Sequence, residues 1–247
     1  MYEGEFLNFK RCGVGIAYDT FGIKAYEGQF LDGRPQGFGT EFLENGNSHY
    51  SGDWDDARFD GCGKLFDLND NCVFEGLFTK GLKDGPATEY FETGEPKFEG
   101  VWKVDQLQGK VVEFYKNGNT KYDGVYTSGF PNDKGTAYWE NGALMYKGEI
   151  LNGQRNGLGN YFGDDGNMKY SGHWLSGYRD GFGREYYETG KVGFEGNWKF
   201  DKPCGQGLEF DINGNKMYEG NWENGHADNQ GQAFDNNGTL RYDGSWV

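Results

Sequence analysis

The side chains in this sequence that most often act as acid–base catalysts near neutral pH are its three histidines. They are His49, His173 and His226, which stand far apart in the chain. No Gly-x-Ser-x-Gly elbow, phosphate-binding loop or zinc-ligand spacing accompanies them. We therefore interpret the histidines as surface residues and predict a protein that is not an enzyme, with no catalytic residue, no cofactor and no metal site.

Two segments rich in Asp and Asn, residues 67–71 and 211–215, faintly resemble calcium-binding loops. Neither is followed by a glutamate at the spacing of a bidentate calcium ligand, and neither is flanked by helical patterns. Both fall on a turn that recurs throughout the chain. Turn chemistry therefore explains them.

The composition narrows the classes of partner and the compartment. A formal net charge of −15 and a pI of about 4.6 argue against a nucleic-acid-binding protein and disfavour an anionic membrane lipid as ligand. A basic protein or a neutral ligand remains open. The chain shows no apolar run long enough to span a membrane and no signal peptide, and its four cysteines form no CxxC motif. We expect a cytoplasmic protein with reduced thiols.

The elements that must position any functional side chain come from one repeated unit. Residues 26–30, Tyr-Glu-Gly-Gln-Phe, show its start: an aromatic, an acidic or polar residue, glycine, a variable residue and an aromatic. The start recurs every 24 residues, and we number each repeat from its first aromatic, as position 1. Ten complete repeats begin at residues 2, 26, 50, 74, 98, 122, 146, 170, 194 and 218, and a partial eleventh begins at 242. The chain 1–247 is therefore interpreted as a single repeat array.

Each repeat predicts two short antiparallel strands. Positions 1, 3 and 5 share one face of the first strand, where glycine between two aromatics leaves a slot for a ring from a neighbouring strand. Position 17, on the second strand, is aromatic in all ten complete repeats. Asn-Gly at positions 20 and 21, as at Asn45-Gly46, is a strong hairpin signal. The predicted fold class is all-β, an antiparallel β-meander of stacked two-stranded hairpins.

The segments 26–39 and 170–183, each with the aromatic–Gly start followed by a loop glycine and Gly-Phe-Gly, resemble the MORN (membrane occupation and recognition nexus) repeat. The resemblance covers the whole chain. It implies an elongated, twisted, single-layer β-sheet rod with one grooved, aromatic-lined face. In that family such arrays act mainly as scaffolds and protein-binding modules in ciliary and cytoskeletal assemblies or beside enzyme domains, and members often pair through their ends.

Some loops depart from the repeat. Position 8 loses its glycine at Phe9, Ala57, Asp105 and Asp201, and position 12 loses it at Asp133 and Asn229. We expect these loops to close differently from the others.

Three surfaces are candidate partner sites. The first is a central patch where positions 4 and 18 become apolar together in repeats 4 to 6. Its residues are Leu77, Phe91, Val101, Tyr115, Val125 and Trp139. An apolar patch on a polar face suggests a binding site, and the alternative is local repacking.

The second is the aromatic groove, which could hold a peptide or a helix, the alternative being that the rings only pack against each other. Its residues are Tyr26, Phe30, Tyr50, Trp54, Phe98, Trp102, Tyr170, Trp174, Trp198 and Trp222. The third is the pair of array ends, which suggest a homodimer; the abrupt stop could equally mark a fragment of a longer protein.

These observations favour a non-enzymatic scaffold or protein-interaction module in a ciliary, cytoskeletal or other large assembly. Its partners would be other proteins, bound as a peptide or helix in the groove or as subunits of the assembly. The alternatives are a phospholipid-binding peripheral membrane module and the targeting region of a longer enzyme.

Overall fold

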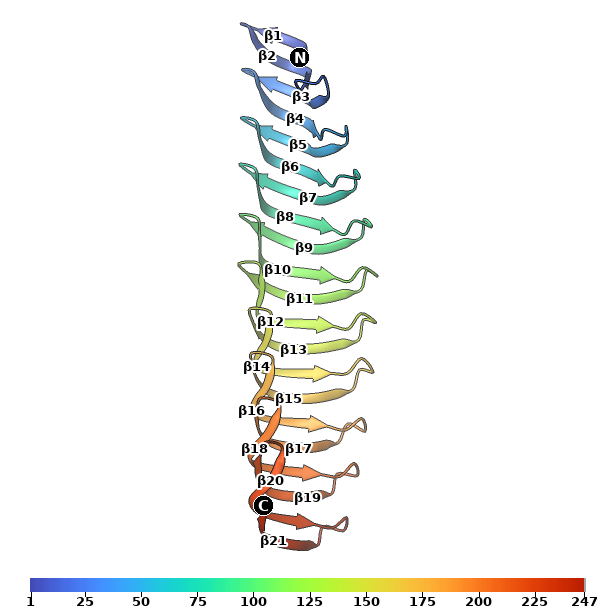
Figure 1. Cartoon of the computed structure of the whole chain (residues 1–247), viewed down its shortest axis with the longest axis vertical. Helices are drawn as coiled ribbons and strands as arrows, with labels where there is room; N and C mark the ends of the chain where they lie inside the picture. The colour runs from blue at the N-terminus through green and yellow to red at the C-terminus, as the bar shows by residue number, and fades with distance from the viewer. Residues whose placement is uncertain (247) are drawn as a thin grey trace. The chain divides into compact units, whose positions relative to one another are not determined.

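The structure is a computed structural model that describes residues 1–246, and these residues form strands and turns without a helix (Figure 1). The chain divides into two units, residues 1–119 with 126–129, and residues 120–125 with residues 130 onward. Strand β11 (Thr120–Thr127) is therefore shared between the units. Each unit is described separately below.

The first unit contains ten strands, each antiparallel to the next along the chain. They are β1 (Tyr2–Leu7), β2 (Lys10–Tyr18), β3 (Lys24–Leu31), β4 (Arg34–Phe42), β5 (Ser48–Asp55), β6 (Arg58–Phe66), β7 (Cys72–Thr79), β8 (Leu82–Tyr90), β9 (Pro96–Lys103) and β10 (Gln106–Phe114).

The second unit repeats this arrangement, again with every strand antiparallel to its successor. Its strands are β12 (Phe130–Tyr138), β13 (Leu144–Leu151), β14 (Gln154–Phe162), β15 (Met168–Leu175), β16 (Tyr178–Tyr186), β17 (Val192–Lys199), β18 (Lys202–Phe210), β19 (Lys216–Glu223), β20 (His226–Phe234) and β21 (Leu240–Trp246). The predicted all-β meander of hairpins is confirmed in both units.

The register places the repeated glycines opposite each other. In the hairpin of β3 and β4, Gly28 at position 3 pairs with Gly39 at position 14, and a β-bulge follows in which Gln29 has no partner in the ladder. Positions 3 and 14 therefore share one face of the sheet, and so do positions 1, 5 and 16, by the alternation of side chains along each strand. We call this the ring face, and the other side the outer face.

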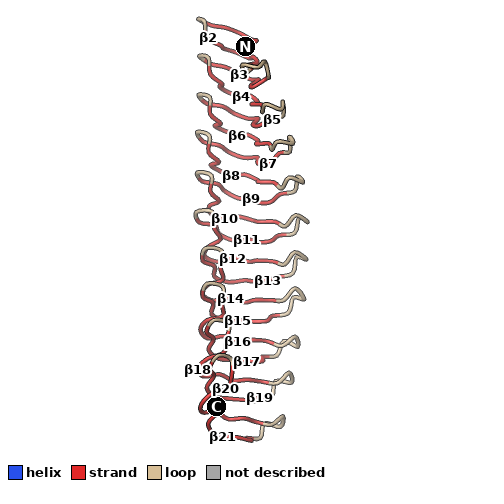
Figure 2. The backbone as a smooth tube through the Cα atoms, viewed as in Figure 1, coloured by secondary structure: helices blue, strands red, loops and turns tan. Residues whose placement is uncertain are grey.

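The strands are joined by two kinds of turn, at opposite margins of each sheet (Figure 2). Asp32-Gly33 forms a two-residue turn with φ of 49° and 90°, the left-handed pair that suits the twist of a hairpin. At Asn45-Gly46 the loop is longer, and the Gly46 N–H donates to the Leu43 carbonyl at 2.9 Å.

The expectation that loops without glycine close differently is wrong. Ala57 at position 8 has a φ of 62°, in the same left-handed region as Gly33 in the preceding hairpin. The other substituted loops do the same: φ is 61° at Phe9, 62° at Asp105, 63° at Asp201, 64° at Asp133 and 53° at Asn229. Left-handed backbone costs a non-glycine residue about 1 kcal/mol, which pairing of the two flanking strands offsets.

Candidate interaction surfaces

The predicted aromatic groove residues mostly form the core of each unit. Tyr50 is fully buried, Tyr26 and Trp54 are nearly so, and the last two rings meet edge to face at 5.2 Å between centroids. Phe30, Trp102, Tyr170, Trp174 and Trp198 are also buried, whereas Phe98 and Trp222 are half-buried. A partner on the ring face would therefore meet the side chains that cover these rings, at positions 10, 16 and 24. Binding in the groove stays a prediction.

The glycines make this packing feasible. A Cβ at Gly39 would lie 2.0 Å from the Tyr26 hydroxyl oxygen, because the tyrosine ring lies flat against that backbone. The Tyr26 hydroxyl donates to the Gln29 carbonyl at 3.1 Å, and Trp54 Nε1 donates to the Gly39 carbonyl at 3.0 Å. The predicted slot for a ring is thus present, and the polar atoms of both rings are satisfied within the sheet.

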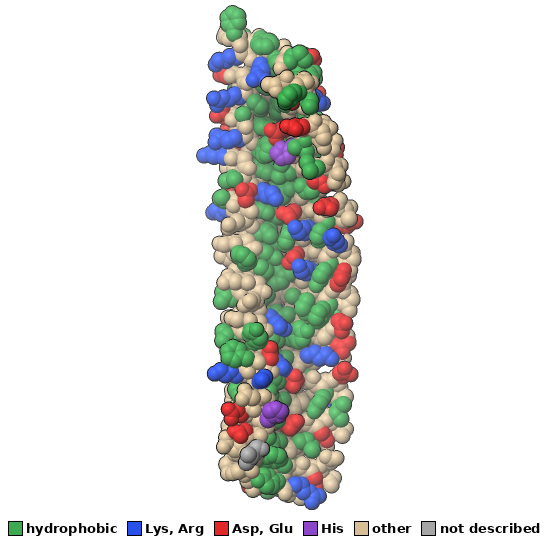
Figure 3. All heavy atoms as spheres, in the orientation of Figure 1, with side chains coloured by type: hydrophobic (Ala, Val, Ile, Leu, Met, Phe, Trp, Pro, Cys, Tyr) green, Lys and Arg blue, Asp and Glu red, His purple; other side chains and the backbone are tan. Residues whose placement is uncertain are grey.

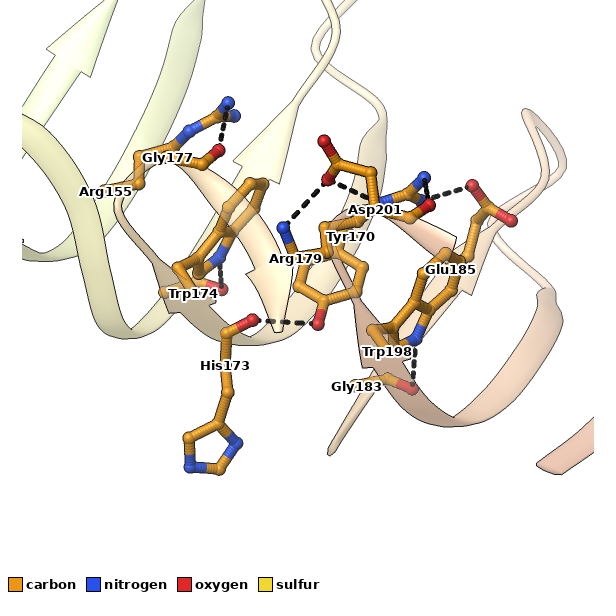
Figure 4. Close-up of polar contacts among 11 residues, drawn as sticks. Arg155, Tyr170, His173, Trp174, Gly177, Arg179, Gly183, Glu185, Trp198 and Asp201 are labelled. Carbon is orange, nitrogen blue, oxygen red and sulfur yellow. Dashed lines mark hydrogen bonds and ion pairs between the residues drawn. The ribbon is translucent and has the colours of Figure 1, made fainter. Parts of the chain in front are cut away.

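Cations at position 10 cover the rings in the second unit (Figure 4). Arg155 Cζ lies 4.0 Å from the Trp174 ring centroid, and Arg179 Cζ lies 3.9 Å from that of Trp198. Such stacking holds a guanidinium flat on the indole by cation–π attraction. Sequence reasoning missed these arginines, although basic residues at one repeat position in so acidic a chain were an available signal.

The two arginines differ in their partners. Arg179 forms ion pairs with Glu185 at 2.7 Å and Asp201 at 3.3 Å. Arg155 donates from Nη2 to the Gly177 carbonyl at 3.0 Å and forms no ion pair with a described carboxylate. Burial lowers the pKa of Arg155, and the nearby Tyr161 and Asp201 partly oppose this shift.

The predicted central patch does not form one surface in the first unit. Leu77 and Val101 precede the buried Phe78 and Trp102 on their strands, so they point to the outer face. Phe91 instead lines a hollow with Lys97, whose Nζ lies 5.3 Å from the Phe98 ring centroid on the ring face.

The remaining patch residues are Tyr115, at position 18 like Phe91, and Val125 and Trp139 in the second unit. Trp139 Nε1 donates to the Phe162 carbonyl at 3.1 Å, and its ring lies 6.2 Å from that of Tyr161. The contacts of Trp139 therefore belong to packing between neighbouring repeats.

The outer face of the first unit carries an apolar hollow of about 510 Å³ around Leu77. Phe38, Cys62, Phe66 and Pro86 line it with Leu77, and Val101 is the cross-strand partner of Pro86. Phe38 is 59% exposed and Val101 41% exposed. Figure 3 shows one face of the chain, on which apolar side chains gather with charged side chains beside them.

Position 4 has a structural role that explains its usual polarity. In the hairpins of β3 with β4 and β5 with β6 its side chain accepts from the backbone of position 13: Phe38 N–H donates to Gln29 Oε1 at 3.1 Å, and Cys62 N–H donates to Asp53 Oδ2 at 3.0 Å. Leu77 lies in the same place opposite Pro86, which has no N–H to donate. The apolar change at Leu77 therefore leaves no donor unpaired there.

The histidines lie in separate environments. His49 Nδ1 lies 2.7 Å from Glu41 Oε2, His173 Nδ1 lies 3.1 Å from the Phe182 carbonyl, and His226 is exposed. Among residues 1–246 no three His, Cys, Asp or Glu side chains are grouped to hold a metal ion, and no helix is long and apolar enough to cross a membrane.

The two calcium-like segments are turns. Asp67 Oδ1 accepts the N–H groups of Asn69 and Asn71 at 2.8 and 2.9 Å, and Asp211 accepts those of Asn213 and Asn215 in the same way. Hydrogen bonds from the backbone and side chain of Asn71 lower the pKa of Asp67, and those from the side chain and backbone of Asn215 lower the pKa of Asp211. Their carboxylates are thus engaged by their own loops.

Comparison with known families identifies the repeat. The MORN repeat model matches residues 26–48, 50–67, 74–95, 146–168, 170–192, 194–216 and 218–239. Each match begins at a position-1 aromatic. No curated protein gave a significant match to this chain.

Proposed function

Because the chain belongs to the MORN-repeat family, we propose that it is a non-enzymatic scaffold that binds other proteins. MORN repeats indicate a repeat protein that takes part in protein or membrane interactions. The proposal chooses proteins as the partners and places the chain in a large assembly, of the ciliary or cytoskeletal kind with which the repeat is associated.

The observation that carries the proposal is the apolar hollow around Leu77. Exposed Phe38 lines it together with Leu77 and Pro86, and exposed Val101 is the cross-strand partner of Pro86. Apolar side chains that stay in contact with water favour a partner that covers them. The hollow is of the size that accepts one or two apolar side chains of another protein.

Charge supports a protein over a membrane as the partner. The chain has a formal net charge of −15, which opposes approach to anionic lipid. Phospholipid binding is the alternative function, and targeting of a longer enzyme is a third.

The test is affinity capture from a native lysate, followed by reconstitution with the purified captured protein. Val101→Glu places a charge beside the hollow, and we expect it to weaken binding at least tenfold. Leu158→Glu is the matched control, because Leu158 is an exposed apolar residue, 54% exposed, in the second unit. Its binding should equal that of the wild type.

Equal binding by both variants would remove the hollow as the site. Flotation of the protein with vesicles of anionic phospholipid at physiological salt, with no protein captured, would favour the membrane alternative. An unfolded Val101→Glu variant, seen by circular dichroism, would show that Val101 is needed for folding and would also remove the hollow as the site.

A further inference from the structure

Repeats of one sequence offer an internal comparison at each position. Position 10 is basic in repeats 1, 4, 7 and 8, as Arg11, Lys83, Arg155 and Arg179. In repeats 4 and 8 two other positions supply carboxylates to the position-10 residue. They are position 16 of the same repeat and position 8 of the next repeat.

Repeat 8 shows the complete arrangement (Figure 4). The Arg179 guanidinium pairs with Glu185 from position 16 and with Asp201 from position 8 of repeat 9. Arg179 also donates from Nη2 to the Asp201 carbonyl at 3.0 Å. Repeat 4 follows the pattern: Lys83 Nζ lies 3.5 Å from Glu89, and the Lys83 N–H donates to Asp105 Oδ1 at 2.8 Å.

Repeat 7 lacks both carboxylates. Position 16 is Tyr161 and position 8 of the next repeat is Gly177, so Arg155 keeps the stacking on Trp174 but loses the two acids. A guanidinium carries five N–H donors. One of them bonds to the Gly177 carbonyl, and among the described residues the others have no protein partner.

Arg155 lines a hollow of about 360 Å³ whose wall holds three cations and two acids, Glu185 and Asp201. Its lining includes Lys169 and Arg179 together with the rings of Tyr161 and Trp174. Lys169 is held at one side by Asp165, at 3.2 Å. Arg179 is neutralised by its own acids, so Arg155 is the cation whose charge is not balanced by an ion pair.

We propose that the hollow at Arg155 binds a side-chain carboxylate, that of an Asp or Glu in a peptide segment of a partner protein. The carboxylate supplies to Arg155 the negative charge that Glu185 supplies to Arg179 in the next repeat. The planar guanidinium, fixed by Trp174 and by Gly177, presents its remaining donors for a bidentate pair. The Tyr161 and Trp174 rings beside it contact the aliphatic part of the incoming residue.

This inference rests on the proposed function, since it names the chemistry of one contact made by a protein partner. A single carboxylate fits better than a membrane surface, because Asp165, Glu185 and Asp201 surround the cations and would repel a sheet of anionic headgroups. The hollow and the Leu77 hollow lie in different units. The two sites are therefore tested independently.

The experiment uses the full chain and a defined probe, N-acetyl-glutamic acid amide, titrated while the Arg Nε–Hε resonances are recorded by NMR. The Arg155 resonance is assigned from its absence in Arg155→Gln. We expect it to shift and saturate with the glutamic acid probe and to stay in place with N-acetyl-glutamine amide, which has the same shape without the charge. Binding should weaken at least tenfold in Arg155→Gln, monitored through the Lys169 and Trp174 signals.

Two further variants keep the result interpretable. Arg11→Gln is the matched control, because Arg11 occupies position 10 in the first unit without an ion pair. This variant should leave probe binding unchanged. Tyr161→Glu supplies the missing acid from within, as Glu185 does for Arg179. It should abolish probe binding while Arg155 is retained and the melting temperature is not lowered.

Equal shifts with the glutamine probe, or equal losses in Arg155→Gln and Arg11→Gln, would overturn the proposal. So would probe binding that survives Tyr161→Glu. Arg155-dependent binding of inorganic phosphate or anionic vesicles, with no response to the glutamic acid probe, would assign the hollow to phosphate instead. Failure of this titration leaves capture through the Leu77 hollow intact, and failure of that capture leaves the titration intact.

Discussion

Replacing Gly39 by alanine tests how the ring core of each repeat is built. The new Cβ would meet Tyr26 Oη at 2.0 Å and Cζ at 2.3 Å, distances that no Cβ contact reaches in folded proteins. The tyrosine ring must therefore move by more than about 1 Å to regain van der Waals separation. It would leave its hydrogen bond to the Gln29 carbonyl and its edge contact with Trp54.

The expected cost in the free energy of unfolding follows from these two losses. Overpacking a well-filled core costs about 1–3 kcal/mol, and a hydrogen bond of this kind contributes about 1 kcal/mol. Gly39→Ala should therefore destabilise the protein by about 2–4 kcal/mol. The measurement is denaturant unfolding, followed by circular dichroism and tryptophan fluorescence.

Two natural repeats indicate how the strain is relieved. Position 14 carries a side chain at Ala87 and Val111, and in those repeats position 1 is Phe74 and Phe98, which lack the hydroxyl. Tyr26→Phe should accordingly reduce the cost of Gly39→Ala, with a coupling energy of about 1 kcal/mol or more in a double-mutant cycle. Additive effects in the cycle would refute the reasoning, because they would mean that the hydroxyl and the Cβ do not compete for one space.

Three other outcomes follow from the structure. Burial raises the pKa of Tyr26 and of Tyr146 to about 12, so the folded state keeps these protons at a pH where the unfolded chain loses them. Stability should therefore be constant below about pH 10 and fall between about pH 10 and 12. Thermal melts across that range measure this. Ala57→Gly should stabilise the protein by about 1 kcal/mol, since φ at Ala57 is 62°, and no gain in chemical denaturation would contradict this. Asp53→Ala should cost about 0.5–1 kcal/mol in the same assay, because the Cys62 N–H loses its acceptor, and an unchanged midpoint would show that water replaces it.

The sequence was sufficient for the strands and for the ring core. A fixed period, aromatics at alternate positions and glycine between them can be satisfied only when positions 1, 3 and 5 share a face. Tyr26, Gly28 and Phe30 are placed accordingly. The same pattern could not predict whether the rings are accessible to a partner, because their burial depends on which side chains at positions 10 and 16 cover them.

The central patch shows where counting along the chain falls short. Gly76 pairs with Ala87, so positions 14, 16 and 18 follow the ring face, whereas position 4 follows the outer face. Grouping Leu77 with Phe91 therefore joined residues from opposite sides. The pairing of positions 3 and 14 was the signal that could have separated them, and it becomes secure only once the register of the hairpin is known.

The hollow at Arg155 illustrates what a repeat array reveals when its structure supplies the missing neighbours. In sequence, Arg155 and Arg179 are the same residue at the same position. Only the fold shows that the acids for Arg179 come from its own strand β16 and from the turn between β17 and β18, 6 and 22 residues away, at 2.7 and 3.3 Å. Once those positions are known, the repeat of Arg155 is seen to have Tyr161 and Gly177 where the repeat of Arg179 has two acids. An arginine that retains its stacking on tryptophan while both of its acids are absent is placed to accept an acid from elsewhere, and the Tyr161→Glu variant tests whether that vacancy accounts for binding.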